Sequence, residues 1–186
     1  MNKRAKEPTV RGLELLIPRG DIEHAVSRLA AEISADYRGH ELVVVGILKG
    51  SFIFMADLVR QLDLPLEVDF IMVTSYGGGT ESCRHVALCQ ELTTDVKGKD
   101  ALVVEDIVDT GYTVEFVARH LRDLGATSVS VCALADKPSR REVPVDIDYV
   151  GFAVPDAFVV GYGLDFDNKF RYLPDIYALE HNDANS

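Results

Sequence analysis

Three segments of the chain repeat apolar residues with the spacing of an amphipathic helix. Asp21 is placed to cap the start of the first, Gly39 lies beyond its end, and its apolar stripe consists of Ile22, Ala25, Val26, Leu29, Ala30 and Ile33. The second segment covers Phe52–Leu62, where Ser51 can serve as the cap. The third covers Thr113–Leu124 and is followed by Gly125, which is placed to stop it.

Between these helices lie short runs that are almost wholly apolar. Such runs are typical of strands buried on both faces of a parallel sheet. The predicted strands are Leu42–Leu48, Leu66–Thr74, His85–Leu92, the start of the run 101–113, Ser128–Leu134 and Tyr149–Val154. Because strands and helices alternate, we predict an α/β fold in which helices flank an open, mostly parallel sheet. In folds of this kind, ligands bind at the carboxyl ends of the strands.

Two stretches of the chain show neither the helical spacing of apolar residues nor an apolar run typical of a strand. Residues Tyr76–Arg84 contain three consecutive glycines and few groups that could pack, so a mobile loop is predicted there. The residues from Pro155 onward mix aromatic residues, glycines and acids without helical spacing. Since no repeat or low-complexity linker interrupts the 186 residues, we expect one domain over 1–186, with a flexible segment at 1–10.

The excess of acidic over basic residues excludes some classes of binding partner. The formal net charge is -11, from 30 acids against 19 bases, which opposes general attraction to nucleic acid or to an anionic membrane. The same charge opposes a polyphosphate substrate, so local cations or a bound metal must offset it. Mg²⁺ suits an oxygen-rich site that holds substrate phosphates.

The cysteines and the N-terminus bear on where the protein resides. Three cysteines, Cys83, Cys89 and Cys132, have no zinc-type spacing and are odd in number, as expected for reduced thiols. Cys132 lies in an apolar strand and is expected in the core. The basic N-terminus is not followed by an apolar stretch, and no segment approaches the length of a membrane span. We expect a cytoplasmic protein.

The run 101–113 is the most informative part of the chain. Its sequence, ALVVEDIVDTGYT, is an apolar strand, two adjacent acids (Glu105 and Asp106), and a turn that leads into a helix. The N–H groups at such a helix start can bind an anion, and Gly111 allows a close approach of the backbone. Neither the P-loop pattern nor the dinucleotide pattern G-x-G-x-x-G is present.

Two interpretations of the acids are open. They could accept hydrogen bonds from the two hydroxyl groups of a ribose, beside a phosphate bound at the helix start. They could also be solvated acids at an ordinary strand end. The acids alone favour the second interpretation, whereas the combination of acids, hydroxyl residues and glycine favours the first.

The run resembles the phosphoribosyl-diphosphate (PRPP) binding motif of the type I phosphoribosyltransferase family. From about Ile17 to Leu179, the chain is similar to the 6-oxopurine branch of that family, the hypoxanthine-guanine enzymes. The resemblance implies a small hood over the sheet, built from the N-terminal segment and residues 155–186. It also implies transfer of the phosphoribosyl group of PRPP to N9 of hypoxanthine or guanine, with Mg²⁺, giving IMP or GMP and pyrophosphate.

The resemblance also assigns residues to the PRPP side of the site. Glu105 and Asp106 would bind the ribose, and Lys49, Gly50 and Arg171 would bind pyrophosphate, with a cis peptide bond before Lys49. Ser75 and Tyr76 would begin a flexible loop that closes over the reacting centre. Relatives have small residues late in this loop, where this chain has Cys83-Arg84-His85. The 5′-phosphate would be held by Asp109, Thr110, Gly111, Tyr112 and Thr113.

On the purine side, the resemblance implies that Lys137 donates to the 6-oxygen of the base and so selects oxo over amino purines. Phe158 would stack on the ring, Val159 would bind it through the main chain, and Asp165 would lie nearby. Asp109 would accept the N7 proton as the catalytic residue. The metal would be held by Glu105, Asp106 and Asp165.

Each assigned residue has a plainer alternative. Taken alone, Lys49, Lys137, Asp165 and Arg171 could be solvated surface residues, and Phe158 could be a core residue. The alternative function is a regulatory protein of the same fold, which binds PRPP or a nucleotide as an effector and nucleic acid as a partner. The acidic net charge disfavours binding to nucleic acid and so disfavours this alternative. Relatives are dimers or tetramers, and Phe52–Leu62 has apolar residues to spare for a homo-oligomer.

Overall fold

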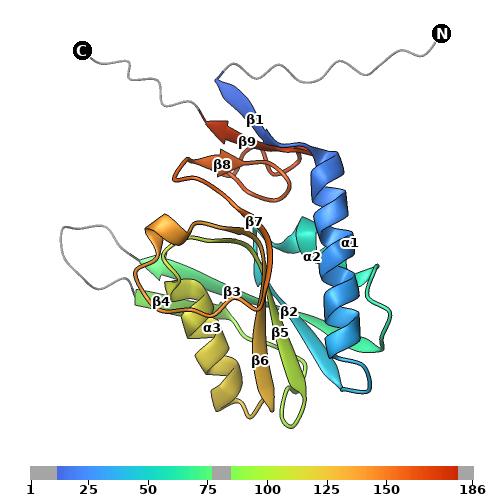
Figure 1. Ribbon diagram of the computed structural model, residues 1–186. Helices are drawn as coiled ribbons and strands as arrows, with labels where there is room; N and C mark the ends of the chain where they lie inside the picture. The colour runs from blue at the N-terminus through green and yellow to red at the C-terminus, as the bar shows by residue number, and fades with distance from the viewer. Residues whose placement is uncertain (1–11, 77–84, 180–186) are drawn as a thin grey trace.

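The computed structural model describes residues 12–76 and 85–179, so the predictions for the N-terminal segment 1–10 and the core of the loop Tyr76–Arg84 lie outside the described residues. Figure 1 shows the elements in the described part of the chain. In chain order they are β1 (Leu13–Ile17), α1 (Arg19–Asp36), β2 (Leu42–Leu48), α2 (Phe52–Val59), β3 (Leu66–Tyr76), β4 (His85–Gln90), β5 (Asp100–Val108), α3 (Tyr112–Asp123), β6 (Ser128–Asp136), the 3₁₀ turn η1 (Pro138–Arg140), β7 (Tyr149–Ala153), β8 (Val159–Val160) and β9 (Ile176–Leu179).

The larger sheet has six strands in the order β4-β3-β2-β5-β6-β7. All neighbours pair in parallel except β3 and β4, which are antiparallel. The connection between β3 and β4 is too short for the crossover that a parallel pair requires. The predicted open, mostly parallel sheet is therefore confirmed. The apolar run of β2 is buried over Leu42–Ile47, as a strand covered on both faces should be.

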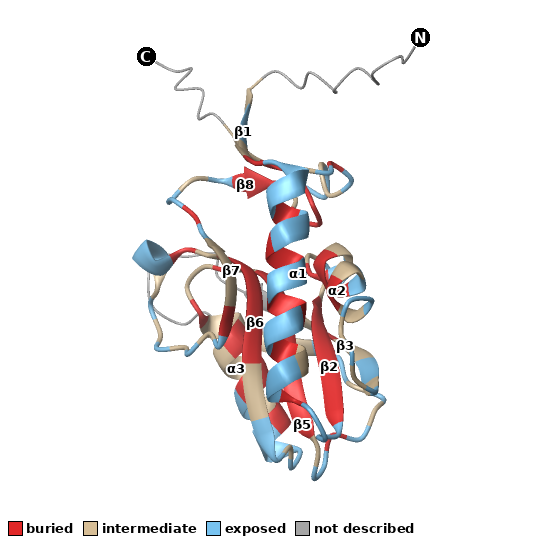
Figure 2. Ribbon diagram, turned by 45° about the vertical axis from the view of Figure 1, so that its right-hand side comes forward, coloured by how far each residue is buried: buried red, intermediate tan, exposed pale blue. Residues whose placement is uncertain are grey.

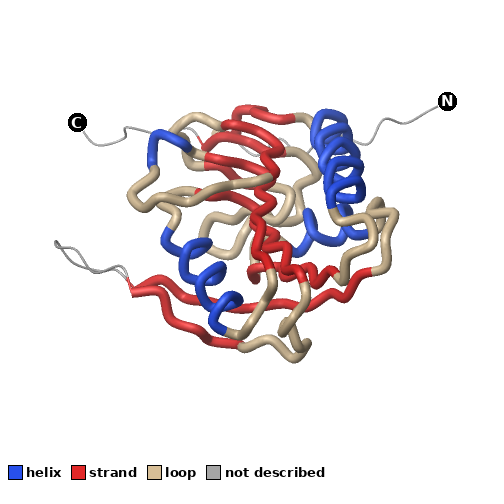
Figure 3. The backbone as a smooth tube through the Cα atoms, turned by 60° about the horizontal axis from the view of Figure 1, so that its bottom comes forward, coloured by secondary structure: helices blue, strands red, loops and turns tan. Residues whose placement is uncertain are grey.

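Helices cover both faces of this sheet. Figure 3 shows α1 and α2 on one side of the strands and α3 on the other, and each side has its own hydrophobic cluster. The predicted stripe of α1 is confirmed, because all six of its apolar residues are buried against the sheet, as Figure 2 shows for this helix. No helix of the described part of the chain is both long enough and apolar enough to span a membrane.

Of the predicted helix caps, Asp21 was wrong, whereas Ser51 does stand at the N-cap position of α2 although its side chain makes no capping hydrogen bond. Pro18 occupies the N-cap position of α1, so Asp21 lies inside the first turn, and the N–H of Arg19 donates instead to Oδ1 of Asp175 at 2.6 Å. Ser51 does precede α2, yet its hydroxyl donates back to the carbonyl of Ile47 at 2.6 Å. In both cases a partner outside the helix competes successfully with the local cap.

The predicted hood is present as a second, three-stranded sheet. Its order is β1-β9-β8, and both strand pairs are antiparallel. Strands from the two ends of the described chain thus form one small sheet, which lies above the main sheet in Figure 1. The residues that connect β8 to β9 fold back towards α2, as the contacts described below show.

The strand order places the site. After β2 the chain adds β3 on one side, whereas β5, β6 and β7 follow on the other side of β2. The order therefore reverses between β2 and β5, and ligands of open α/β sheets bind at such a switch point, beyond the carboxyl ends of the strands. The residues found there are Lys49 and Gly50 after β2, and Glu105 and Asp106 near the end of β5.

Candidate active site

Glu105 and Asp106 are both buried, so the interpretation of them as solvated acids was wrong. Burial, and then the neighbouring Asp106 charge, raise the pKa of Glu105 well above its ordinary value. Burial also raises the pKa of Asp106, while a 2.9 Å hydrogen bond from the Ile107 N–H and the charge of Arg171 act in the opposite direction. The carboxyl groups of these two adjacent residues therefore both have a raised pKa, and each affects the pKa of the other.

One carboxyl oxygen of these two acids makes no hydrogen bond within the described part of the chain. Glu105 Oε2 is buried without a hydrogen-bond partner in the described structure. A buried polar atom of this kind costs free energy unless something fills its coordination. An oxygen donor with this vacancy suits a hard cation or the hydroxyl group of a sugar.

The loop after β2 lies directly against these acids. The Leu48–Lys49 peptide bond is cis, as the resemblance implied. A Cβ added to Gly50 would overlap the Asp106 carboxylate, so only glycine allows this contact. Two positions predicted to bind different parts of one substrate, Gly50 and Asp106, are therefore in direct contact.

A segment of the hood completes this cluster. We call residues 161–171 the hood loop. A Cβ at Gly163 would overlap the carbonyl oxygen of Gly50, so the two backbones touch. Arg171 donates from Nη1 to the Gly163 carbonyl at 2.5 Å, and its Nη2 lies 2.6 Å from Oδ1 of Asp165. The Arg171 side chain is mostly buried, so the solvated alternative was wrong for this arginine.

Asp165 is held on both of its oxygens. Its Oδ1 pairs with Arg171, and its Oδ2 accepts from the Asn168 N–H at 2.7 Å. Within residues 12–76 and 85–179, no three His, Cys, Asp or Glu side chains are grouped so that they could hold a metal ion. A metal bound here would need ligands from the substrate as well.

The turn after β5 leads directly into α3, as the sequence predicted. Gly111 has φ +95 and stands at the N-cap of α3, in a conformation that favours glycine. The Thr110 carbonyl accepts hydrogen bonds from the N–H groups of Glu142 and Val143, at 3.0 and 3.2 Å. Asp109 pairs with Arg140, whose Nε lies 3.2 Å from Oδ1. The turn is thus fixed by the segment that follows β6.

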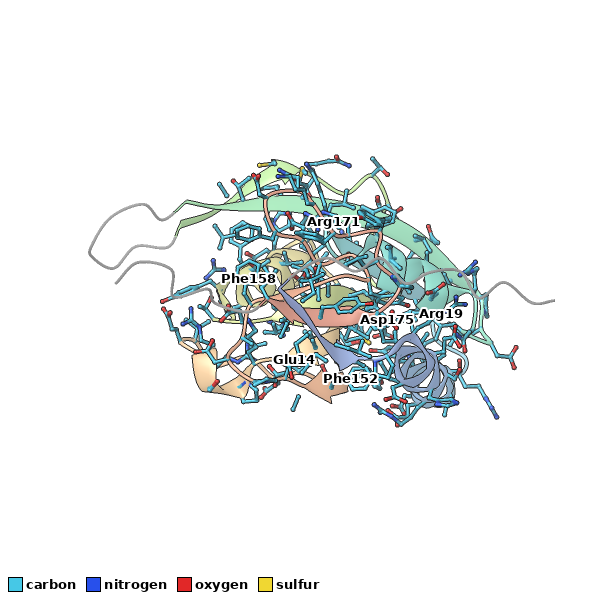
Figure 4. The ribbon with its side chains drawn as sticks, turned by 90° about the horizontal axis from the view of Figure 1, so that it is seen from above. Glu14, Arg19, Phe152, Phe158, Arg171 and Asp175 are labelled. Atoms are coloured by element: carbon cyan, nitrogen blue, oxygen red, sulfur yellow. The ribbon has the colours of Figure 1, made fainter. Side chains whose placement is uncertain are left out.

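The predicted purine residues come from the end of β6 and from the hood. Lys137 directly follows β6. It is only 7% exposed, so the interpretation of it as a solvated surface residue was wrong. Its backbone N–H donates to the Val108 carbonyl at 2.9 Å. Phe158 is 45% exposed and packs edge-on against Phe166 at 5.3 Å, so it is not a core residue. Val159 is buried in β8. Figure 4, seen from above, shows Phe158 and Arg171 on the hood and Arg19 beside Asp175.

Several predicted features are only partly described. Ser75 and Tyr76 end β3, but the rest of the predicted flexible loop and Cys83-Arg84 lie outside the described residues. Cys132 is buried, as predicted, and Cys89 is exposed; neither forms a disulfide.

Three participants were missed by sequence reasoning: Gly163, Tyr162 and Arg140. The signal for the first two was the pattern Gly-Tyr-Gly at 161–163, because flanking glycines commonly mark positive φ. All three residues of that pattern do have positive φ. The contact of Arg140 with Asp109 had no sequence signal, since the two residues belong to different loops.

The chain is similar to known proteins over most of its length. Residues 18–167 match the family model described as phosphoribosyl transferase domain. The hypoxanthine phosphoribosyltransferase of Salmonella typhimurium is 46% identical over 164 residues, which are 87% of this chain and 92% of that protein. The hypoxanthine-guanine phosphoribosyltransferase of Staphylococcus aureus is 42% identical over 167 residues, 90% of this chain and 93% of that protein.

Solved structures give the same result. A crystal structure of a hypoxanthine phosphoribosyltransferase from Staphylococcus aureus superposes with a TM-score of 0.90 at 40% identity, and covers 97% of this chain and 100% of that one. The hypoxanthine phosphoribosyl transferase of Trypanosoma cruzi gives 0.87 at 35% identity, with 94% and 95% covered. The chain therefore belongs to the phosphoribosyl transferase family and, within it, to the hypoxanthine-guanine phosphoribosyltransferases of purine salvage.

Proposed function

We propose that the protein transfers the 5-phosphoribosyl group of PRPP to N9 of hypoxanthine or guanine and releases pyrophosphate, forming IMP or GMP. The observation that carries this proposal is the contact of three segments at the switch point of the sheet. Asp106 touches Gly50, Gly50 touches Gly163, and Gly163 is hydrogen-bonded to Arg171. A sugar diol and a diphosphate can be bound side by side by such a cluster.

Glu105 and Asp106 bind the two ribose hydroxyl groups in this proposal. Both acids are buried and close together, which supports a role in orienting the sugar ring rather than in attracting it from solution. A diol can donate to both carboxyl groups and fill the vacant Glu105 Oε2. A fixed orientation of the ring lowers the activation barrier, because the entropy of aligning the anomeric carbon is lost on binding and not in the transition state.

The departing pyrophosphate binds to Arg171 and to the backbone of Lys49 and Gly50. Arg171 has a planar fork that suits phosphate oxygens, and its two present partners, the Gly163 carbonyl and Asp165, hold that fork in place. Negative charge grows on the diphosphate as the anomeric bond breaks, so a fixed guanidinium stabilises the transition state more than the ground state.

The oxygen donors of this cluster also fit Mg²⁺. The vacant Glu105 Oε2 and the neighbouring Asp106 and Asp165 are the ligand type that this cation prefers, with the remaining ligands supplied by substrate oxygens and water. Bound there, Mg²⁺ would supply positive charge that offsets the charge of the diphosphate. Asp165 would have to exchange part of its pairing with Arg171 to reach the metal.

The 5′-phosphate binds at the start of α3. Asp109, Thr110, Gly111, Tyr112 and Thr113 form this loop, whose free N–H groups face the phosphate. Gly111 has little room beside it, because a Cβ there would lie 3.1 Å from Val143. Binding of a remote, unreactive phosphate is then converted into alignment at the reacting carbon.

The purine binds between this loop and the hood. Asp109 accepts the N7 proton, Lys137 donates to the 6-oxygen, Phe158 stacks on the ring and Val159 binds it through the main chain. The half-exposed ring of Phe158 supports this, because its face is available to a base. The burial of Lys137 supports its role too, since a buried ammonium group needs an acceptor.

We further propose that the protein is cytoplasmic and forms a homodimer or homotetramer. The free thiols of Cys89 and Cys132 support the location. The exposed ring of Phe52 on α2 supports association of copies. Sedimentation velocity would measure the number of subunits; a monomer at micromolar concentration would contradict the proposal.

The test of the function is incubation with Mg²⁺ and PRPP against hypoxanthine, guanine, xanthine, adenine and uracil, with nucleotide formation followed by chromatography. We expect IMP and GMP, and no AMP or UMP. Binding of PRPP without any nucleotide product would favour the regulatory alternative instead.

A further inference from the structure

Tyr162 has an unusual place in the hood loop. It is a bulky residue with φ +50, a backbone conformation that side chains rarely adopt and that persists only where the surroundings enforce it. Its ring is 7% exposed and belongs to the hydrophobic cluster beneath the hood. Its hydroxyl group donates to Oδ2 of Asp57, on α2, at 2.6 Å. This hydrogen bond joins residues 105 positions apart.

The phenol is suited to remain a donor. Burial, and then the hydrogen bond to Asp57, raise the pKa of Tyr162 far above its ordinary value. The hydroxyl therefore keeps its proton at every pH at which the enzyme would work. A hydrogen bond to a carboxylate is stronger than one between neutral groups.

Asp57 is joined to the Lys49–Gly50 loop through a short, rigid path. It lies in α2, which begins at Phe52, directly after that loop and Ser51. Ser51 is buried, accepts from the Met55 N–H at 2.8 Å and donates to the Ile47 carbonyl at 2.6 Å. Displacement of Asp57 would therefore be transmitted to the loop.

The residue after Tyr162 forms part of the site itself. Gly163 abuts the Gly50 carbonyl, and a Cβ there would lie 3.9 Å from Cβ of Ile53 on α2. Gly163 also holds Arg171 in both directions: its N–H donates to the Arg171 carbonyl at 3.0 Å, and its carbonyl accepts from the guanidinium at 2.5 Å. The position of Arg171 thus depends on how the hood loop is seated on α2.

We propose that the Tyr162–Asp57 hydrogen bond is a positioning contact for the pyrophosphate half of the active site. It fixes the hood loop on α2, and so fixes Gly163 and Arg171 against Gly50 and Asp106. This inference rests on the proposed roles of Arg171 and the Lys49–Gly50 loop. Neither Tyr162 nor Asp57 touches substrate in it.

The main test is Tyr162→Phe, which removes only the hydroxyl oxygen. We expect the KM for PRPP, and the KM for pyrophosphate in the reverse reaction, to rise five- to twentyfold. The KM for hypoxanthine should stay within twofold of wild type, because Asp109 and Lys137 lie outside the hood loop and Phe158 and Val159 precede it in the chain. Calorimetric titration of pyrophosphate with Mg²⁺ should show the same fold loss of affinity, which gives a readout that does not depend on turnover.

Two variants of Asp57 separate acceptor from charge. Asp57→Asn keeps an oxygen that accepts from the tyrosine hydroxyl. In this variant the KM for PRPP and the KM for pyrophosphate should both stay within twofold of wild type. Asp57→Ala removes the acceptor and should reproduce Tyr162→Phe. Both lose the ion pair with Arg60, which is exposed and contributes little.

Tyr149→Phe is the matched control. Tyr149 is buried to the same degree, and its hydroxyl donates to Oδ2 of Asp36 at 2.8 Å. This pair lies where β7 begins and α1 ends, away from the carboxyl ends of the strands at which the site lies. We expect Tyr149→Phe to lower Tm about as much as Tyr162→Phe does, with unchanged KM values.

The outcomes are distinguishable. Unchanged pyrophosphate affinity in Tyr162→Phe, or an equal change in Tyr149→Phe, would overturn the positioning role and leave the proposed function intact. Absence of nucleotide formation by the wild type would overturn the proposed function. The calorimetric comparison would still decide whether this hydrogen bond shapes an anion site.

Discussion

The carbonyl oxygen of Gly50 occupies the space that a Cβ of residue 163 would need. Gly163 also has φ +101, where side chains are strained. Gly163→Ala should therefore push the hood loop away from Gly50, and we expect kcat/KM for PRPP to fall about a hundredfold, since a shift of about 1 Å in a positioning group has that order of effect. Steady-state kinetics would measure it.

Gly20→Ala is the control for that substitution. Gly20 is helical and has nothing within 4 Å of an added Cβ. The change should stabilise the protein by about 0.5 kcal/mol and leave the kinetics unchanged. A PRPP KM within threefold of wild type in Gly163→Ala would show that the contact with Gly50 is dispensable.

Asp109→Asn tests the proposed base. The amide keeps the shape of the side chain and its contact with Arg140 but cannot take a proton. We expect kcat to fall by about 10²- to 10⁴-fold, the usual contribution of general base catalysis, and PRPP affinity to change much less. Rapid-quench measurement of single turnovers would isolate the chemical step. Equal activity would remove Asp109 from this role.

Lys137→Met tests selection of the base. Methionine keeps the apolar stem and loses the cation. We expect kcat/KM for hypoxanthine to fall about ten- to hundredfold, because a hydrogen bond to a charged group is worth about 1.5–3 kcal/mol. The PRPP KM should not change, and preference for hypoxanthine over adenine should shrink by the same factor. Retained preference would assign selection to other groups.

Glu105→Gln should separate stability from function. The wild-type carboxyl group is buried beside Asp106, and both its burial and that neighbouring charge raise its pKa. The amide of glutamine cannot ionise. We expect Tm at pH 8 to rise by about 2–4 °C, as for a gain of about 1 kcal/mol. Affinity for PRPP with Mg²⁺ should fall at least tenfold. A lower Tm would mean that the burial of this acid is better compensated than the structure indicates.

Asp69→Asn tests an anchor distant from the site. Burial raises the pKa of Asp69, but N–H groups of Thr94, Phe70 and Thr93 and the Thr93 hydroxyl outweigh it and lower the pKa to about 2, from 3.8. A lowered pKa means stabilisation that is complete above pH 3.8 and is lost as the pH falls through about 2.

At pH 7, Asp69→Asn should therefore cost about 1–2 kcal/mol in urea unfolding, and the difference from wild type should shrink between pH 4 and 2. Asp95→Asn, which loses a charge that accepts one hydrogen bond from the Lys97 N–H, should cost less. A difference for Asp69→Asn that does not vary with pH would contradict a role for its charge.

How far the sequence predicts the structure depends on whether the information is local. The strand Leu42–Leu48 was predicted to the residue, because an unbroken apolar run can only be buried. The cap Asp21 was wrong, because the competing carboxylate comes from Asp175, and no local rule detects a partner 156 positions away.

The site divides in the same way. Glu105, Asp106 and Gly111 could be found because a buried strand, a pair of acids and a glycine lie in one short run. The seating of Gly163 on Gly50, and of Tyr162 on Asp57, depends on how the chain returns over the sheet. The spacing of apolar residues along the sequence does not predict how the hood packs on the main sheet.

The hydrogen bond from the Arg19 N–H to Asp175 has a consequence for biosynthesis. The initial turn of α1 is completed by a carboxylate 156 positions further along the chain. During translation that turn can fray until Asp175 has been made and has left the ribosome. The final packing of α1 and that of the hood on the sheet should therefore be reached together, and only after the strands of the main sheet have been synthesised.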